Sequence, residues 1–383
     1  MLGSLTPQQF LERHWQKKPL LIRGALPGFA SPLSADELAG LACEPEVESR
    51  LVLGKLGARW VLEHGPFESK RLEKLPNKDW TLLVQDVDKW VPEVASLLAP
   101  LRWLPDWRID DIMISFAAPG GSVGPHTDQY DVFLLQAQGR RRWQLAEKFD
   151  PTFLPDVDLK ILQSFTPEQE HVYEPGDILY LPPGVAHYGL ALDACMTFSI
   201  GFRAPDQREL IGALAEELMG RASEARFRDP ERGVTAQPSR IAESELGSLR
   251  ELVRGGLTLS DEELDRFLGR YLTRPKPQLE IEGSPSEAKR VQQRLARGSR
   301  LLRRGRWLLV PRGQELWLFS DGREHRLEPA HLQWLEPLAD GSVFEAATLE
   351  RYPAALPLLV ELLGAGSLDW QDPTSGPRSS KKP

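Results

Sequence analysis

The sequence predicts a chain of several domains, with a mainly β first domain, a helical block and a mixed α+β final domain. Its 383 residues are more than one hydrophobic core normally holds. Short strand-like runs broken by Gly, Pro and Asp fill most of the first part, and apolar residues at helical spacing follow. We expect domains at residues 1–205, 206–275 and 276–370, and a polar, disordered tail at 371–383.

Composition and charge exclude several classes of protein. The formal net charge is −8, so the chain lacks the general basic surface that nucleic-acid backbones require. Two cysteines, Cys43 and Cys195, form neither a disulfide framework nor a four-cysteine zinc site. No apolar run approaches the roughly 20 residues of a membrane helix, and the N-terminus has no signal-peptide core. We therefore expect a cytoplasmic protein without a membrane partner.

The first domain begins with two predicted helices, at residues 6–15 and 34–42. Apolar or alternating runs bounded by turn residues follow. We expect strands within these runs at 58–65, 110–121, 130–139, 140–146, 171–184 and 194–203. Several short strands at regular spacing predict a β-sandwich or barrel.

The helical block carries more apolar positions than a short insertion needs. Leu210, Leu214 and Leu218 form one stripe, and a second helix is expected at 239–254. A third helix begins at Ser260, which forms a capping-box pair with Glu263. It is expected to bury Leu264, Phe267, Leu268 and Tyr271. These stripes favour a homodimer formed through the helical block.

The last domain mixes both kinds of element. After a linker with one short strand at 274–286, we expect helices at 286–297, 329–337, 342–350 and 356–363, and strands at 306–312 and 315–322. Trp307, Trp317 and Trp334 are expected in its core. A basic run, KRVQQRLARGSRLLRRGR, occupies 289–306. Such a run is usually a solvated face, and it also suits contact with RNA.

Two histidines and one aspartate form the candidate metal site. His126 and Asp128 lie two residues apart in GGSVGPHTDQYDVF, a triplet that alone is weak. The segment EPGDILYLPPGVAHY strengthens the prediction, because two tight turns flank a buried strand and aim His187 rigidly. Two histidines and one carboxylate bind iron(II) on one face and leave positions open for substrate and oxygen. Zinc is disfavoured, because its structural sites are closed by four ligands.

The strand at 140–146 places an arginine inside the domain. Its residues alternate strictly, so Arg141 shares the apolar face with Trp143 and Leu145. A buried guanidinium needs an anionic partner, which is either an internal carboxylate or the carboxylate of a ligand. Small hydroxyl residues, Ser115 on one strand and Thr197 and Ser199 on another, suit either ordinary packing or contact with such a ligand.

These residues resemble the Jumonji C branch of the cupin-fold 2-oxoglutarate dioxygenases. The segment FLERHWQKKPLL carries the N-terminal signature of that branch at Phe10, Trp15, Lys18, Pro19 and Leu20. More narrowly, GPHTDQYDVFLLQAQGRRRW followed by PGDILYLPPGVAH resembles the bacterial ribosomal oxygenases. The resemblance implies a mainly β double-stranded β-helix with an all-α dimerisation domain and a C-terminal α+β winged-helix-like domain.

The resemblance also implies cofactors and roles. His126, Asp128 and His187 match the ligands of Fe(II), and O2 is the oxidant. Arg141, fifteen residues after the first histidine, matches the residue that holds the distal carboxylate of 2-oxoglutarate, where many relatives have lysine. Ser115 matches a second contact to this cosubstrate.

The implied reaction hydroxylates the 3-position of an arginine side chain in a large-subunit ribosomal protein. A guanidinium group favours a carboxylate or aromatic neighbour, so Gln129, Tyr130 and Asp131 are the candidate substrate contacts. Two alternatives stay open. One is a hydroxylase of the same family that acts on histidine, asparagine or lysine. The other is a nucleic-acid-binding regulator with a cupin sensor.

Overall fold

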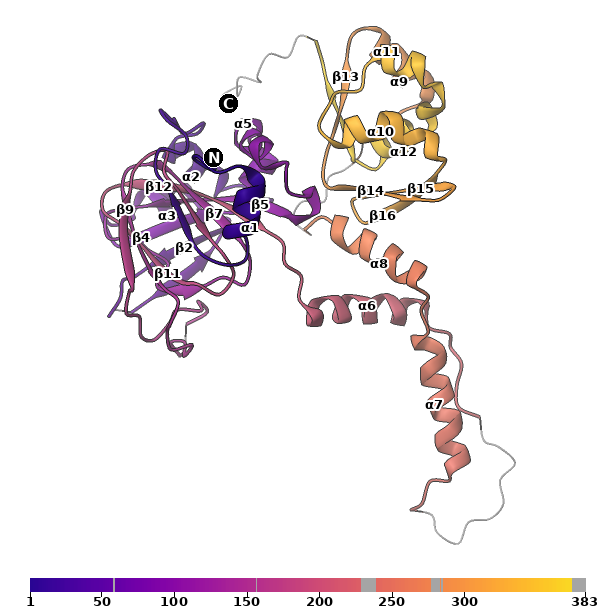
Figure 1. Ribbon diagram of the computed structural model, residues 1–383, viewed down its shortest axis with the longest axis horizontal. Helices are drawn as coiled ribbons and strands as arrows, with labels where there is room; N and C mark the ends of the chain where they lie inside the picture. The colour runs from indigo at the N-terminus through magenta and orange to yellow at the C-terminus, as the bar shows by residue number, and fades with distance from the viewer. Residues whose placement is uncertain (58, 156, 229–238, 277–282, 284, 374–383) are drawn as a thin grey trace. The chain divides into compact units, whose positions relative to one another are not determined.

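A computed structural model describes the chain except for residues 58, 156, 229–238, 277–282, 284 and 374–383. The described residues form two compact units, one from Met1 to Ala204 and the other from Pro205 onward. Both are visible in Figure 1. The boundary predicted at 205 falls at this division. The further division at 275 stays a prediction, because the second unit contains both the helical segment and the α+β segment.

Among its described residues, the first unit has five short helices and twelve strands. The helices are α1 (Pro7–Arg13), α2 (Ala35–Leu41), α3 (Ser69–Glu73), α4 (Val87–Trp90) and α5 (Pro92–Ala95), with 3-10 turns at Ser96–Leu101 and Asp106–Arg108. The strands are β1 (Leu20–Ile22), β2 (Ser49–Leu53), β3 (Val61–His64), β4 (Trp80–Val84), β5 (Ile109–Ala117), β6 (His126–Thr127), β7 (Val132–Gln138), β8 (Arg141–Ala146), β9 (Gln169–Tyr173), β10 (Ile178–Leu181), β11 (Ala186–Ala191) and β12 (Cys195–Phe202).

These strands form two sheets of antiparallel pairs, the double-stranded β-helix that was predicted. The larger sheet has the order β1-β10-β7-β12-β5-β4-β2-β3 and the smaller one the order β6-β11-β8-β9. Every predicted strand run of the first domain contains a strand. The sequence analysis did not identify β1, β2, β4 and the short β6, nor helices α3 to α5.

The outer face of the larger sheet carries the main core of this unit. Thr6 and Ser34 cap α1 and α2 with capping boxes, as their positions before each predicted helix allow. From α1, Phe10 is fully buried and packs against Phe133 of β7 and Tyr180 of β10. This packing anchors the sheet from outside, so its inner face is free to carry polar groups.

The second unit has seven helices and five strands among its described residues. They are α6 (Gln207–Arg221), α7 (Glu243–Leu257), α8 (Asp261–Thr273), α9 (Ala288–Ala296), β13 (Arg300–Arg303), β14 (Trp307–Arg312), β15 (Glu315–Ser320), β16 (Arg323–Leu327), α10 (Leu332–Ala339), α11 (Ala346–Arg351), α12 (Leu356–Gly364) and β17 (Leu368–Gln371), with 3-10 turns at Pro329–His331 and Pro353–Ala355. β14, β15 and β16 form one sheet, and β13 pairs with β17.

Several predictions for this unit are confirmed and others need correction. Ser260 caps α8 through the predicted capping box with Glu263, and Trp307, Trp317 and Trp334 are buried. Leu264, however, is 37% exposed rather than buried, because α8 uses Phe267 as its fully packed position.

The element boundaries also differ. Helix α7 starts and ends later than the predicted 239–254, and the first part of the predicted helix 342–350 is irregular. Two residues of the tail predicted at 371–383 are structured, because Gln371 belongs to β17 and Asp372 accepts hydrogen bonds from Arg294. Residues 374–383 of that predicted tail lie outside the described residues. The strand predicted within 274–286 lies mostly outside the described residues. None of the described helices is long and apolar enough to cross a bilayer.

Candidate functional site

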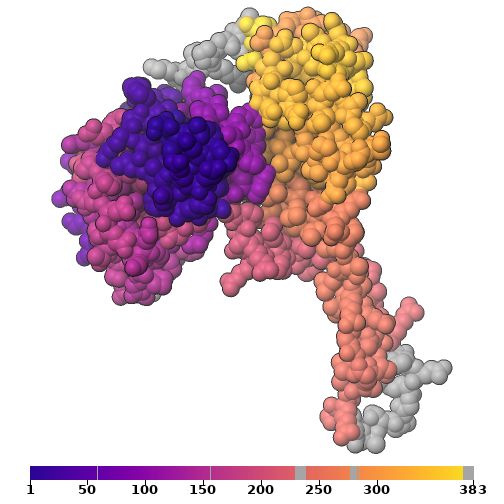
Figure 2. Space-filling model, in the orientation of Figure 1, coloured from indigo at the N-terminus to yellow at the C-terminus, as the bar shows by residue number. Residues whose placement is uncertain are grey.

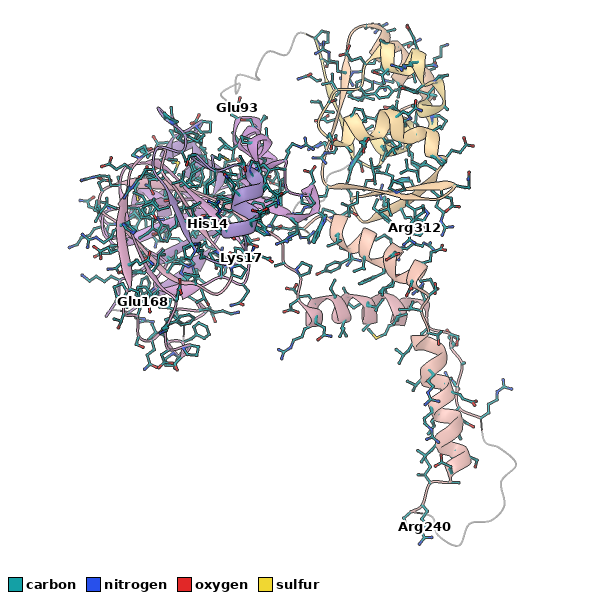
Figure 3. All side chains as sticks on the ribbon, viewed as in Figure 1. His14, Lys17, Glu93, Glu168, Arg240 and Arg312 are labelled. Atoms are coloured by element: carbon teal, nitrogen blue, oxygen red, sulfur yellow. The ribbon has the colours of Figure 1, made fainter. Side chains whose placement is uncertain are left out.

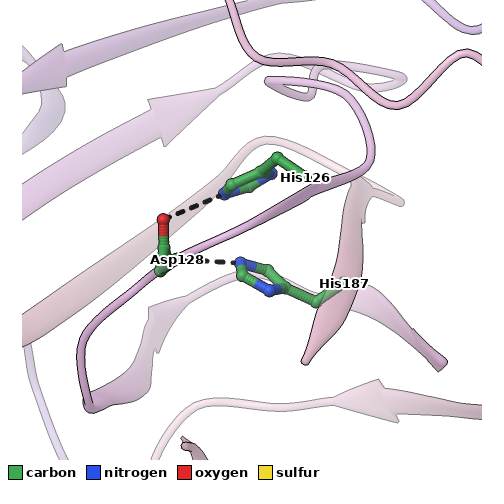
Figure 4. A group of neighbouring side chains, drawn as sticks. All are labelled: His126, Asp128 and His187. Atoms are coloured by element: carbon green, nitrogen blue, oxygen red, sulfur yellow. Dashed lines mark ion pairs between the residues drawn. The ribbon is translucent and has the colours of Figure 1, made fainter. Parts of the chain in front are cut away.

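The two sequence-predicted histidines are cross-strand neighbours. His126 of β6 pairs directly with His187 of β11, and Asp128 follows in the loop after β6. The Nε2 atom of His126 lies 3.9 Å from Asp128 Oδ1, and that of His187 lies 3.6 Å from Asp128 Oδ2 (Figure 4). The two imidazole rings have centroids 4.2 Å apart. Three side chains from two segments therefore face one point.

Backbone carbonyl groups fix which ring nitrogen faces that point. His126 Nδ1 donates to the carbonyl oxygen of Gly124 at 2.9 Å, and His187 Nδ1 donates to that of Val185 at 3.0 Å. A carbonyl oxygen only accepts, so both Nδ1 atoms carry the proton. Both Nε2 atoms then carry a lone pair that faces the point shared with the Asp128 carboxylate. This is the arrangement by which proteins orient metal-binding histidines.

A tight turn ties the two ligand-bearing segments together. The predicted turn Pro182-Pro183-Gly184 places Gly184 at a φ of +82°, a conformation that favours glycine. From there, the Gly184 N–H donates to the carbonyl oxygen of Asp128 at 2.7 Å. The turn before His187 therefore also holds the loop of Asp128 in place.

The protonation state suits metal binding. Burial, together with the nearby His126 ring, lowers the pKa of His187 to about 4. The imidazole of His187 is thus neutral near pH 7, and its contact with Asp128 is not a salt bridge at that pH. A neutral imidazole has a free lone pair, which a metal ligand requires.

The three groups fit a divalent cation. Their ligand atoms all lie within 4.8 Å of one another, and they are the only such group of His, Cys, Asp and Glu found in the described part of the chain. Ligands that bind one ion at about 2.1 Å and at right angles are roughly 3 Å apart, so small side-chain shifts would complete the geometry. Two nitrogens and one carboxylate on one side leave the other coordination positions open.

This group lies in a cavity of about 520 Å³ whose lining comes from both sheets. Met113 and Ser115 of β5 and Ser199 of β12 contribute from the larger sheet, and Arg141 and Trp143 of β8 from the smaller one. The cavity is large enough for a small organic acid beside a protein side chain.

Arg141 is buried in this cavity without a carboxylate partner. Its side chain is on the inward face, as the strand alternation predicted, and only 5% of it is exposed. Nη1 donates to Thr197 Oγ1 at 3.2 Å and to Ser115 Oγ at 3.4 Å, and the guanidinium lies over the Trp143 ring. Its Nε is buried and has no hydrogen-bond partner, and Arg141 makes no ion pair with any described residue. The charge of Arg141 is therefore not neutralised by any described side chain.

The surroundings of Arg141 include two hydroxyl residues singled out from the sequence, Ser115 and Thr197, and one residue that was missed, Gln136. Ser115 contacts the guanidinium, as expected of a residue beside a ligand. Thr197 also contacts it and in turn donates to Gln136 Oε1 at 3.1 Å. Gln136 is a buried polar residue of β7 with the same parity as the cavity-lining Val132 and Leu134, which is the signal that could have revealed it.

The structure places the three predicted substrate contacts, Gln129, Tyr130 and Asp131, in different surroundings. Tyr130 lines the cavity. Burial, with the Asp128 and Asp111 carboxylates, raises the pKa of its hydroxyl, so Tyr130 is neutral. Gln129 is exposed and is not among the cavity-lining residues.

The prediction for Asp131 is wrong, because its carboxylate is completely buried on the other side of β7. There it accepts hydrogen bonds from Tyr180 Oη at 2.6 Å and from Arg108 and Gln16 at 3.2 Å each. Asp131 is a structural residue of the outer core.

A different aspartate takes the place in the cavity that Asp131 was expected to take. Asp111 of β5 lines the cavity and is 5% exposed. Its Oδ2 accepts from the backbone N–H of Asp86 at 3.0 Å and from Gln85 at 3.3 Å. Gln85 is itself held by Arg50 Nη2 at 3.1 Å. The cavity therefore has a cationic end at Arg141 and a fixed carboxylate near Tyr130.

Comparison with known proteins identifies the family. The JmjC domain profile matches residues 96–210, and a ROXA-like winged helix profile matches 249–369. The chain is 39% identical over 373 residues to the ribosomal protein uL16 3-hydroxylase of Escherichia coli, covering 95% of this chain and 97% of that protein. The chain belongs to the JmjC ribosomal oxygenase family.

Other members agree with this assignment. A probable ribosomal oxygenase of Haemophilus influenzae is 41% identical over 215 residues, 55% of this chain and 53% of that protein. The crystal structure of E. coli YcfD matches with a TM-score of 0.82 at 38% identity, covering 96% of this chain and 99% of that one. A structure of YcfD, a ribosomal oxygenase, with cobalt and 2-oxoglutarate matches with a TM-score of 0.79 at the same identity and coverage.

Removal of one histidine should abolish metal binding without unfolding this JmjC ribosomal oxygenase. We expect His187→Ala to weaken Co(II) binding by more than about 100-fold, since even the loss of an outer partner of a ligand costs 10–100-fold. The measurement is titration with Co(II), followed by visible absorption and calorimetry. His171→Ala, at an exposed histidine of β9, is the matched control. Equal Co(II) affinities of the two variants would contradict the metal assignment.

Proposed function

We propose that the chain is an Fe(II)- and 2-oxoglutarate-dependent dioxygenase that hydroxylates the 3-position of an arginine side chain in the large-subunit ribosomal protein uL16. The observation that carries the proposal is the unpaired, buried guanidinium of Arg141 in the same cavity as the His126, Asp128 and His187 group. One relative, named as a uL16 3-hydroxylase, aligns over 95% of this chain.

His126, Asp128 and His187 would hold the iron, and Arg141 would bind the distal carboxylate of 2-oxoglutarate. Bound Fe(II), with 2-oxoglutarate and O2, supplies the insertion of an oxygen atom into a C–H bond while 2-oxoglutarate is converted to succinate and carbon dioxide. Ser115 and Thr197 orient the guanidinium of Arg141. Trp143 covers it and lies 5.8 Å from the His187 ring, between centroids, so it helps to exclude water.

The opposite end of the cavity suits the substrate guanidinium. Asp111 presents a carboxylate there that is fixed by Gln85 and the Asp86 N–H, and Tyr130 adds an aromatic ring. Carboxylate and aromatic neighbours are the usual partners of arginine. With the arginine head group held at Asp111 and Tyr130, its methylene carbons would lie toward the iron. We therefore assign substrate binding to Tyr130 and Asp111, in place of Gln129 and Asp131.

The direct test is mass spectrometry of uL16 after incubation with the purified protein, Fe(II) and 2-oxoglutarate. The proposal predicts a mass gain of one oxygen atom that fragmentation places on one arginine and that requires both additions. Omission of 2-oxoglutarate is the control. An oxygen gained on histidine, asparagine or lysine would instead establish another hydroxylase of the family. No change in uL16 or in any other ribosomal protein would favour the regulator alternative.

The role of Arg141 is tested by its removal. We expect Arg141→Ala to weaken the binding of 2-oxoglutarate by about 10- to 100-fold, because each hydrogen bond to a charged group contributes about 1.5–3 kcal/mol. The readout is the apparent affinity for 2-oxoglutarate in anaerobic titrations with Fe(II). Arg140→Ala is the matched control, since Arg140 pairs with Asp193 on the exposed face. An unchanged affinity in Arg141→Ala would remove Arg141 from the site.

We also propose that the helical segment 206–275 joins two copies of the chain. Fourteen large hydrophobic residues are exposed among the described residues, and nine of them lie in this segment. They are Ile211, Met219, Ile241, Leu246, Leu249, Leu252, Val253, Leu257 and Leu264. An apolar surface of this kind marks a protein–protein contact. A second copy is the simplest partner, because a twofold interface needs only the same surface on both chains.

Charge placed in this surface should separate the copies. We expect Leu249→Asp combined with Leu252→Asp to convert a dimer into a monomer, because burial of two carboxylates in an apolar interface costs several kcal/mol. Light scattering after size-exclusion chromatography measures the mass, and Glu251→Asp, between the two positions on α7, is the control. A monomeric wild-type protein, or a double variant that stays dimeric, would refute the proposal.

The proposed substrate places the reaction where ribosomes are, in the cytoplasm.

A further inference from the structure

The most basic segment of the chain lies in the ROXA-like winged-helix part of the second unit, which Figure 2 shows as a rounded mass in orange and yellow. Residues 286–306 contain eight Lys or Arg residues and a single acidic one, Glu287, although the whole chain carries a net charge of −8. Positive charge is therefore concentrated locally against the overall charge of the molecule.

The basic side chains of helix α9 and of the residue after it lie on the face opposite the domain core. Val291 and Leu295 are buried in the domain core. Lys289, Arg290 and Arg297 are exposed on the opposite side, with Gln293 between them along the same face. Since an α-helix rises about 6 Å over four residues, these side chains form a row about 12 Å long.

The row borders a groove whose far wall is rigid. Arg294, on the same face, donates three hydrogen bonds to the Asp372 carboxylate after β17, from Nη2 at 2.9 and 3.1 Å and from Nε at 3.3 Å. Its guanidinium also lies 4.4 Å from the centroid of the Trp370 ring, and Ser299 Oγ donates to Asp372 at 2.7 Å. These contacts join α9 to the end of β17, so the groove between them has fixed walls.

The basic residues of the row differ from other arginines of the same unit. Arg312, labelled in Figure 3, pairs with Asp265, and Arg266 and Arg270 both pair with Glu324. Lys289, Arg290 and Arg297 make no ion pair with any described residue. An exposed row of unpaired cations beside a structured groove attracts a polyanion.

We propose that this groove, formed by α9 together with Ser299, Asp372 and Pro373, binds the phosphate backbone of RNA. Arg and Lys side chains at helical spacing contact successive phosphates, and the Gln293 amide can donate to a phosphate or to a 2′-hydroxyl. The choice of RNA over an acidic protein rests in part on the proposed function, because a ribosomal protein in its particle lies against RNA. In this proposal, the groove binds RNA of the ribosomal particle, and the JmjC cavity binds the arginine side chain that is hydroxylated.

The test measures binding of a fluorescein-labelled RNA hairpin to the full-length protein by fluorescence anisotropy, without iron or 2-oxoglutarate. We expect an affinity in the range of non-specific binding, about 10⁻⁴–10⁻⁶ M, that falls steeply as NaCl is raised. Arg290→Glu combined with Arg297→Glu should weaken binding about tenfold or more and flatten the salt dependence, since each phosphate contact contributes about 0.7 to the slope of log K against log salt.

Arg208→Glu is the control, because Arg208 is an exposed arginine of α6 outside this groove. It should bind the hairpin within about twofold of wild type, as one lost surface charge outside the contact changes little. Circular dichroism melting checks that all variants are folded. The readout does not depend on hydroxylation, so loss of the proposed activity on uL16 would leave this result interpretable.

Three results would overturn the proposal. The first is that the hairpin does not bind at low salt. The second is that the double variant and the Arg208→Glu control bind the hairpin equally. The third is that a polyglutamate peptide binds more tightly than the hairpin and displaces it, which would assign the groove to an acidic protein.

Discussion

A guanidinium group buried in the double-stranded β-helix without a carboxylate partner is the constraint on which the site depends. An unpaired charge in a protein interior costs several kcal/mol, and the two hydroxyl groups and the aromatic ring around Arg141 offset only part of it. In the proposed function, the dianionic 2-oxoglutarate would supply the missing negative charge. We therefore infer that Arg141 of β8 serves ligand binding rather than the stability of the empty protein, with its unpartnered Nε as a donor that the ligand would satisfy.

The fold can carry this buried charge because its apolar core and its polar cavity lie on opposite faces of the larger sheet. The outer face of the larger sheet packs against helices and aromatic rings such as Phe10, and it contributes most of the buried apolar surface. The inner face can then carry polar groups around the cavity. On the smaller sheet, direct pairing of His126 with His187 and the hydrogen bond from Gly184 to Asp128 fix three ligands through the backbone. Rigid backbone placement of this kind is what a metal site requires.

The sequence predicted the parts of the site that local rules control. Strict alternation along 140–146 placed Arg141 inside, and the two turns around β10 indicated that His187 is held in a fixed direction. The same rule exposes the error at Asp131. Val132 and Leu134 line the cavity, so Asp131 has the parity of Phe133, which packs in the outer core. Applied backward from Ser115 and Met113, alternation would have found Asp111 instead.

Other features could not be read from the chain alone. Arg50 reaches the cavity from β2, and its place beside Gln85 depends on the strand order β5-β4-β2, which pairs residues far apart in sequence. Helices α3 to α5 are too short for a periodic pattern to reveal. The basic run at 289–306 was visible, but only the packing of Val291 and Leu295 shows which of its residues face solvent together.

The measurement that tests the central claim most directly is a crystal structure of the protein with Mn(II) and 2-oxoglutarate under anaerobic conditions. The account predicts one metal ion bound by Nε2 of His126, Nε2 of His187 and the Asp128 carboxylate. It also predicts the distal carboxylate of 2-oxoglutarate on the Arg141 guanidinium, with Nε or Nη within hydrogen-bonding distance. A metal bound elsewhere, or a cosubstrate whose distal carboxylate leaves Arg141 without an anion, would contradict it.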